Sequence, residues 1–219
     1  MIIVIDGPAG SGKSSTARAV ADKLKIEYID SGALYRTAAL IYIEADQDEE
    51  TFFHLLDQKN ISFRYEDRAF RVEVDEEPVT DDIRTPRVAN CVSEVAAMPE
   101  VRAYVNNLMR KAVEHGIYIA EGRDLGTAVF PDAALKFFMW ADLEERAKRR
   151  FEERKERNPD LTLQEVRENI EQRDLKDSSR KTDPLKKADD AIEIDTTSLT
   201  FEQQVNQICL EIKQRTEVI

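Results

Sequence analysis

Residues 7–14 read Gly-Pro-Ala-Gly-Ser-Gly-Lys-Ser, directly behind the short apolar stretch Ile2-Ile3-Val4-Ile5. This order predicts a strand, a turn through three glycines and a helix that begins near Lys13. The turn would leave backbone N–H groups pointing into one cup, to which the helix dipole adds partial positive charge. A glycine-rich turn without a ligand is the alternative, but the flanking strand and helix argue against it. We therefore expect the loop to bind a nucleoside triphosphate, with Lys13 on its β- and γ-phosphates and Ser14 on Mg²⁺.

The composition predicts one soluble globular domain. Of the 219 residues, 42% are hydrophobic and 35% are charged, as is usual for globular proteins. A run of about 18 apolar residues, the length a membrane-spanning helix needs, does not occur in the sequence. The chain starts with a predicted core strand rather than an export signal. The two scattered cysteines, Cys91 and Cys209, are expected to be free thiols, so we expect a cytoplasmic location and no membrane partner.

The net charge of −12 restricts the possible partners. A nucleic-acid surface needs a basic face to neutralise phosphates, so we expect no nucleic-acid partner. We also expect no zinc site, because His54 and His115 share no motif. A protein with this charge that handles anionic substrates must gather its arginines locally.

Short apolar runs alternate with amphipathic segments along most of the chain. Because such alternation builds βαβ units, we predict an α/β fold with a parallel, doubly wound sheet of five strands flanked by helices. The predicted strands are 2–5, 27–29, 117–120, 135–139 and 191–194.

The helices are predicted from their apolar stripes and end signals. Ser31 is the expected N-cap of a helix that follows the second strand, and Pro86 opens a helix behind Thr85. Met98-Pro99 separates that helix from the next, which Gly116 is expected to close. Further helices are predicted over 144–157 and 162–177, and a last one carries the inward stripe Phe201, Val205, Ile208 and Ile212.

The stretch 61–79 has a different period. Apolar and polar residues alternate on both sides of the turn Glu66-Asp67-Arg68. This pattern predicts an antiparallel hairpin that is exposed on one side. Inside an α/β chain, such a hairpin indicates an inserted subdomain.

Arginines and carboxylates cluster near the predicted strand ends and on predicted helices. Each cluster alone has an ordinary structural explanation, such as a cap, a turn or a solvated ion pair. Their convergence with the phosphate-binding loop on one sheet edge favours a second anion site, as phosphoryl transfer between two anions requires. The clusters are 30–36, Ser93 with Arg102, 121–127, and Arg173, Asp177 and Arg180, spaced to share one helix face.

The order and wording of these segments resemble the bacterial cytidylate kinase family over nearly the whole chain. The similar segments are I-D-G-P-A-G-S-G-K-S, D-S-G-A-L-Y-R, I-R-T-P-R-V-A-N, V-S-E-V-A-A-M-P-E-V-R, E-G-R-D-L-G-T-A-V-F-P-D-A and R-D-L-K-D-S-S-R with D-P-L behind it. The first segment alone indicates only a superfamily, whereas the later ones are specific. Lys181-Thr182-Asp183 is more polar than the family pattern, which puts the geometry of that loop in doubt.

The resemblance implies an enzyme that transfers phosphate from ATP to CMP or dCMP with Mg²⁺. On the acceptor side, it implies that Ser93, Arg102 and Asp124 read cytosine and that Arg36 and Arg123 clamp the phosphate. It implies that Ser31, Arg173 and Asp177 contact the pentose, with Arg173 also open to a phosphate contact and Arg180 left to phosphate or base. The expected catalytic residues are Lys13, Arg123, Arg150 and Arg173. The expected ATP-binding residues are Gly7, Pro8, Ala9, Gly10, Ser11, Gly12, Lys13, Ser14, Ser15 and Arg146.

The resemblance also implies one kinase domain over residues 1–219. Its core would comprise 1–57, 88–145 and 163–219, with a nucleoside-monophosphate-binding insert at about 58–87 and a short helical lid at about 146–162. We expect a monomer. Two alternatives remain open, a P-loop kinase for UMP, dTMP or shikimate, and a nucleotide-dependent switch or motor. The arginine clusters and the acidic charge favour transfer over the switch.

Overall fold

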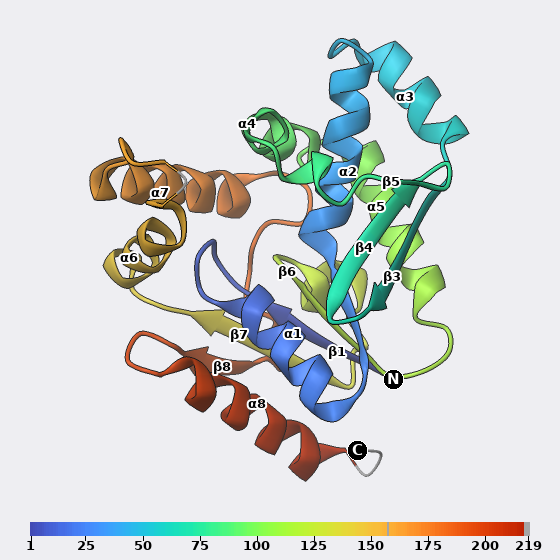
Figure 1. Cartoon of the computed structure of the whole chain (residues 1–219). Helices are drawn as coiled ribbons and strands as arrows, with labels where there is room; N and C mark the ends of the chain where they lie inside the picture. The colour runs from blue at the N-terminus through green and yellow to red at the C-terminus, as the bar shows by residue number, and fades with distance from the viewer. Residues whose placement is uncertain (157, 217–219) are drawn as a thin grey trace.

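The computed structural model describes residues 1–156 and 158–216 of the chain (Figure 1). Within them, five parallel strands form the central sheet in the order β2-β6-β1-β7-β8. This confirms the predicted doubly wound α/β fold. The strands are β1 (Ile2–Asp6), β2 (Glu27–Asp30), β6 (Tyr118–Gly122), β7 (Leu135–Trp140) and β8 (Ile192–Asp195).

Helices cover both faces of this sheet. In Figure 1, α1 (Lys13–Leu24) and α8 (Phe201–Arg215) pack together on one face. On the other face, α2 (Ser31–Glu44) contacts α5 (Pro99–Ala112). The remaining α-helices are α3 (Glu49–Gln58), which the sequence pattern did not reveal, α4 (Pro86–Val95), α6 (Leu143–Arg154) and α7 (Leu163–Ser179). A short 3-10 helix spans Asp82–Arg84, and a π-helix spans Leu125–Val129.

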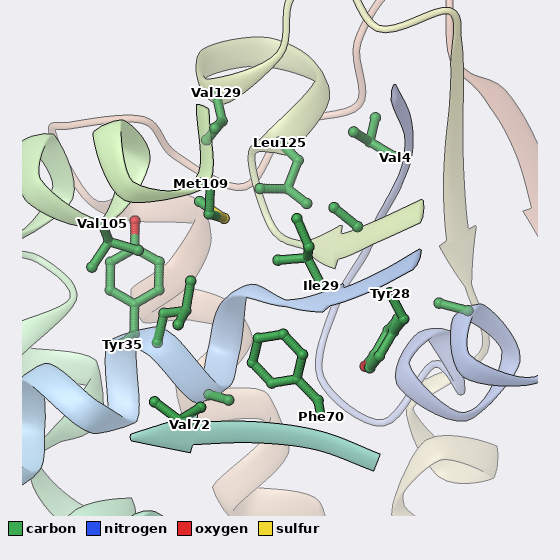
Figure 2. Packing of buried hydrophobic residues seen from close by; sticks show 14 of the residues in the cluster. Val4, Tyr28, Ile29, Tyr35, Phe70, Val72, Val105, Met109, Leu125 and Val129 are labelled. Carbon is green, nitrogen blue, oxygen red and sulfur yellow. The ribbon is translucent and has the colours of Figure 1, made fainter. Parts of the chain in front are cut away.

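The predicted hairpin is present and is extended by a third short strand. The antiparallel sheet consists of β3 (Ile61–Glu66), β4 (Ala69–Val74) and β5 (Glu77–Pro78). Its inner face carries Phe70 and Val72, which point toward β2 and α2 in Figure 2. The Phe70 ring lies 5.9 Å from the Tyr28 ring, edge to face. Aromatic burial of this kind attaches the insert firmly to the core of the protein.

The carboxyl ends of three strands meet at one edge of the central sheet. The parallel register places Asp6 of β1 beside Gly122 of β6, and Asp30 of β2 beside Glu121. Each strand end leads into a segment with polar or charged residues that the sequence singled out. Beyond this edge lie α6 and α7, at the left of Figure 1. The fold therefore gathers the candidate site residues from distant parts of the chain.

Two predictions about helix ends are wrong. Asp30, not Ser31, caps α2, because the Asp30 carboxylate accepts from the Ala33 N–H at 2.9 Å. The Ser31 hydroxyl instead donates to the Glu121 carbonyl at 2.7 Å. Gly116 does not close α5, which already ends at Ala112. Its φ of 104° serves the turn that leads into β6.

Two smaller predictions are also wrong, and a third falls on a residue outside the described part of the chain. Phe201 begins α8 and is 52% exposed, so the inward stripe of that helix consists of Val205, Ile208 and Ile212. Arg180 follows the last residue of α7, so it leaves the helix instead of sharing a face with Arg173 and Asp177. Arg157, the expected end of the basic helix, lies outside the described residues.

The main core lies between the central sheet and the helices on its faces. Figure 2 shows Ile29 of β2 close to Leu125, with Tyr35 of α2 beside Val105 of α5. A second, smaller apolar cluster joins α6 and α7 to the phosphate-binding loop through Ala9. Among the described residues, no helix combines the length and apolar character that crossing a membrane requires.

Candidate active site

The glycine-rich loop joins β1 to α1 in a conformation that its glycines make possible. Gly10 and Gly12 have φ values of 77° and 89°, in the left-handed region that other residues rarely adopt. A Cβ atom on Gly7 would lie 1.9 Å from the Met139 carbonyl oxygen, so this position has no room for a side chain. Among the described residues, no side chain caps the first turn of α1. The N-terminus of α1 is therefore open to an anion.

Lys13 and Ser14 begin α1 and both face Glu121 at the end of β6. The Ser14 hydroxyl donates to one Glu121 oxygen at 2.8 Å, and the Lys13 ammonium lies 4.0 Å from the other. The Lys13 ammonium also donates to the Pro8 carbonyl at 3.0 Å. Burial, reinforced by nearby Arg123, lowers the pKa of Lys13, and burial raises the pKa of Glu121. A bound polyphosphate would favour the charged form of Lys13.

A cavity of about 520 Å³ opens at the edge of the sheet where β1, β2 and β6 end. It reaches from the glycine-rich loop across α2 and α4 to α6 and α7, and is large enough for small-molecule ligands. Most of the site residues expected from the sequence line this one space. They are Ala9, Gly10, Lys13, Ser14, Ser31, Arg36, Ser93, Arg123, Asp124, Arg150, Arg173, Asp177 and Arg180.

Seven of the expected site residues are not part of the cavity wall. Two of them are arginines, Arg102 and Arg146, which are buried behind it. The Ser15 hydroxyl donates to the Gly12 carbonyl at 2.9 Å, which stabilises the loop itself. The remaining four, Gly7, Pro8, Ser11 and Gly12, belong to the loop backbone between β1 and α1.

The guanidinium groups of Arg123 and Arg173 both line the cavity, and the positive charge of each disfavours that of the other. The Arg123 Nε donates to Asp177 at 2.8 Å, but the buried Nε of Arg173 has no hydrogen-bond partner within the described residues. Burial, together with the positive charge of Arg123, lowers the pKa of Arg173 to about 10. A buried donor without a partner is costly, and an anion in the cavity would satisfy it. The pair lines the same cavity as Lys13 and could hold an anion there.

Asp124 forms the centre of a buried charge network on the other side of the cavity. Its two oxygens accept from two different arginines, Arg102 on one and Arg180, at 2.7 Å, on the other. The Arg102 guanidinium also stacks over the Tyr35 ring at 5.4 Å and donates to the Ala96 carbonyl at 3.1 Å. Both oxygens of Asp124 are thus held in a defined plane, with lone pairs left for a ligand.

Arg146 connects α6 to the glycine-rich loop. It donates to the Ala9 carbonyl at 2.9 Å and pairs with Asp174 of α7. The Asp174 carboxylate in turn accepts from the Ala9 N–H at 3.0 Å. Both backbone groups of Ala9 are therefore tied to α6 and α7. This arrangement links the position of those helices to the shape of the loop, and contact of Arg146 with ATP stays a prediction.

Positive charge predominates in the cavity although the chain is strongly acidic. The described residues that line it include seven cations and five carboxylates, whereas the whole chain carries a net charge of −12. The cations are Lys13, Arg36, Arg123, Arg150, Arg154, Arg173 and Arg180. Such a local excess attracts anionic ligands against the repulsion of the surface.

Several site residues were missed by reasoning from the sequence. Glu121 stood in a recognised cluster at a strand end, so its position could have suggested its contact with Ser14. Arg154 lines the cavity one helical turn beyond Arg150, and that spacing was also visible. The sequence gave no signal for the carboxylate contacts of Asp174 with Ala9 and of Asp183 with Arg102, because these partners are far away in the sequence.

Comparisons with known proteins agree with this geometry. The family model described as cytidylate kinase matches residues 3–214. The cytidylate kinase of Carboxydothermus hydrogenoformans is 40% identical over 222 residues, covering 100% of both chains. That of Bacillus thuringiensis is 44% identical over 209 residues, covering 94% of this chain and 93% of the relative.

A solved structure supports the fold independently. Shikimate kinase from Acinetobacter baumannii, in complex with shikimate, superimposes with a TM-score of 0.50 at 15% identity, covering 100% of this chain and 95% of that one. At this identity the likeness concerns the fold alone. Because the family model and the relatives match almost the whole chain, the protein belongs to the cytidylate kinase family.

Proposed function

We propose that this chain transfers the γ-phosphate of ATP to CMP or dCMP, giving ADP and CDP or dCDP. The observation that carries the proposal is the position of Arg173 and Arg123 in the same cavity as Lys13 and Ser14. A triphosphatase needs one anion site, whereas a nucleoside monophosphate kinase needs two adjoining ones. Family membership supports the choice of cytidine nucleotides.

The ATP site is built from the loop and the first turn of α1. The backbone N–H groups at 10–15 would surround the β-phosphate, since Pro8 has none and that of Ala9 donates to Asp174, and Lys13 would bridge the β- and γ-phosphates. Arg150 from α6 lines the cavity and would reach the transferring group when the lid closes. Arg146 would support this site through Ala9.

The residues present fit a Mg²⁺ ion. The Ser14 hydroxyl and a Glu121 oxygen lie 2.8 Å apart at the base of the cavity, and hard oxygen ligands of this kind suit Mg²⁺ together with phosphates and water. The ion would neutralise the charge on the β- and γ-phosphate oxygens. Ser14 and Glu121 would orient it, while Lys13 holds the phosphates beside it.

The acceptor nucleotide would lie across the ends of β2 and β6. Arg36 and Arg123 would hold its phosphate, and Ser31, Arg173 and Asp177 its pentose. Ser93, Arg102 and Asp124 would read the base, because a carboxylate accepts from the cytosine N4 amine, whereas uracil has an acceptor oxygen there. An oxygen of the acceptor phosphate attacks the γ-phosphorus of ATP, and the bond between the γ-phosphorus and the oxygen that bridges it to the β-phosphate breaks. ADP leaves with that oxygen, and no covalent enzyme intermediate forms.

The insert at about 58–87 and the lid at about 146–162 would close over the two nucleotides. Closure excludes water and so protects ATP from hydrolysis. We further propose that the enzyme acts as a monomer in the cytoplasm, where both nucleotides are available. Light scattering on the purified protein tests the monomer, since a molar mass above that of one 219-residue chain would contradict it.

A coupled assay of ADP release tests the reaction. Wild-type protein is supplied with ATP, Mg²⁺ and CMP, dCMP, UMP, dTMP or shikimate in turn, and turnover with CMP and dCMP is expected to exceed the others. Lys13→Met should lower kcat by orders of magnitude, because the phosphates lose their main cation. Lys111→Met, at an exposed position of α5, is the matched control. Preference for another acceptor, or near-normal turnover of Lys13→Met, would refute the assignment.

A further inference from the structure

Asp183 lies in the loop behind α7, where the polar stretch Lys181-Thr182-Asp183 meets the D-P-L segment. Its carboxylate accepts from the Nε of Arg102 at 2.9 Å, and its backbone carbonyl accepts from the Nε of Arg180 at 2.6 Å. Its φ of 47° is left-handed, a conformation that aspartate tolerates better than most residues. One residue thus contacts both arginines that grip Asp124.

Three ion pairs join the side chains of Asp183, Arg102, Asp124 and Arg180 in that order, and the backbone carbonyl of Asp183 closes the ring onto Arg180. Asp124 accepts from Arg102 on one oxygen and from Arg180 on the other, and Asp183 holds both arginines from behind. Arg102 is 1% exposed, so a lost partner at its Nε could not be replaced easily by bulk water. The carboxylates and guanidinium groups balance, so the ring is neutral without a ligand.

We propose that Asp183 is a positioning residue for base recognition. By holding Arg102 and Arg180 in place, it fixes the plane of the Asp124 carboxylate that accepts from the exocyclic amine of a cytosine nucleotide. Asp183 is absent from the described residues that line the cavity, so it acts through the arginines and not on the base. This inference rests on the proposed function and names a determinant of its substrate choice.

The alternative is that Asp183 only stabilises the loop behind α7. In that case its loss would lower the stability of the protein and affect all substrates equally. A positioning role makes a different prediction, because only the nucleotide that donates to Asp124 depends on the orientation of that carboxylate. The ratio of CMP to UMP turnover therefore separates the two explanations.

The test compares three variants of the full chain. Asp183→Gly removes the carboxylate but keeps the left-handed backbone and the carbonyl that binds Arg180. Asp183→Asn keeps an oxygen that can accept from Arg102 without the charge. Asp189→Asn changes the same type of residue at an exposed position of the same loop and is the control. The quantities to be measured for each variant are kcat and KM for CMP, UMP and ATP, together with the midpoint of thermal unfolding.

Asp183→Gly is expected to raise the KM for CMP on the order of tenfold, because the buried Arg102 loses one charge-assisted hydrogen bond. The KM for ATP and the kcat should stay within about twofold, the CMP preference should fall, and Asp183→Asn should be intermediate. An unchanged CMP-to-UMP ratio in both variants would overturn the role of Asp183. A wild-type protein inactive toward CMP would instead overturn the proposed function. If Asp183→Gly fails to fold, Asp183→Asn alone decides the outcome.

Discussion

Replacing Asp124 by asparagine changes one oxygen into a donor while keeping the size of the side chain. In the structure this carboxylate is 4% exposed and each of its oxygens accepts from an arginine. The asparagine amide group would have to face Arg102 or Arg180, and both offer only donors. The substitution therefore removes the charge from both buried ion pairs of Asp124 and turns the acceptor surface that would face the base partly into a donor.

The expected change in substrate choice follows from the hydrogen bonds. A hydrogen bond to a charged group contributes about 1.5–3 kcal/mol, so kcat/KM for CMP should fall roughly 10- to 150-fold. The kcat/KM for UMP should fall less than that for CMP, or rise, because the O4 of uracil would meet a carboxylate in the wild type and an amide donor in the variant. The CMP-to-UMP preference should therefore decrease by at least about tenfold.

The measurement is a coupled assay of ADP release with each nucleotide below its KM, and the KM for ATP is determined in parallel. Asp132→Asn, at an exposed position before β7, is the control for loss of one negative charge. The thermal midpoint of each variant shows whether the fold persists. A folded Asp124→Asn protein with the wild-type CMP-to-UMP ratio would refute the assignment of Asp124 to base recognition.

Two further predictions concern the loop and the core. Asp174→Asn should raise the KM for ATP roughly tenfold with little effect on the KM for CMP, because it weakens the contacts that hold Ala9; equal changes in both KM values would contradict this. Burial raises the pKa of Asp6 to about 7 from its ordinary value of 3.8, so the native state keeps a proton that the unfolded chain releases. The free energy of unfolding of the wild type, relative to Asp6→Asn, should therefore fall as pH rises from about 4 to 7, by at most about 1.4 kcal/mol per pH unit. Urea unfolding at several pH values measures this difference, and parallel profiles for the two proteins would disprove it.

Features encoded by neighbouring residues were predictable from the sequence. The strand 2–5, the glycines and Lys13 follow one another directly, so their spacing alone indicated the phosphate-binding loop. The period-two pattern of 61–79 indicated the hairpin for the same reason. Where two residues could serve one role, the pattern was ambiguous. Asp30 and Ser31 are both good caps, and the contact of Ser31 with Glu121, 90 positions away, decided between them.

Contacts between distant residues were not predictable, and the network around Asp124 depends on them. Asp183 lies 81 positions from Arg102, and its polarity looked like a local departure with no function. The contacts of Arg146 were also not predictable from its position in the sequence. Contact of this guanidinium with ATP stays a prediction, and the sequence did not reveal that it also binds Ala9 and Asp174.

Affinity for anions and choice of base therefore have different origins in this chain. The anion sites come from local motifs, because a glycine turn and a few arginines near strand ends suffice to attract phosphates. We propose that the choice of base depends on the orientation of one buried carboxylate, which Arg102, Arg180 and Asp183 would fix from separate segments. Substitutions in the loop should thus impair all acceptors alike, whereas substitutions in the network should change the ratio between acceptors. A network variant that lowers CMP and UMP turnover equally would show that this separation does not exist.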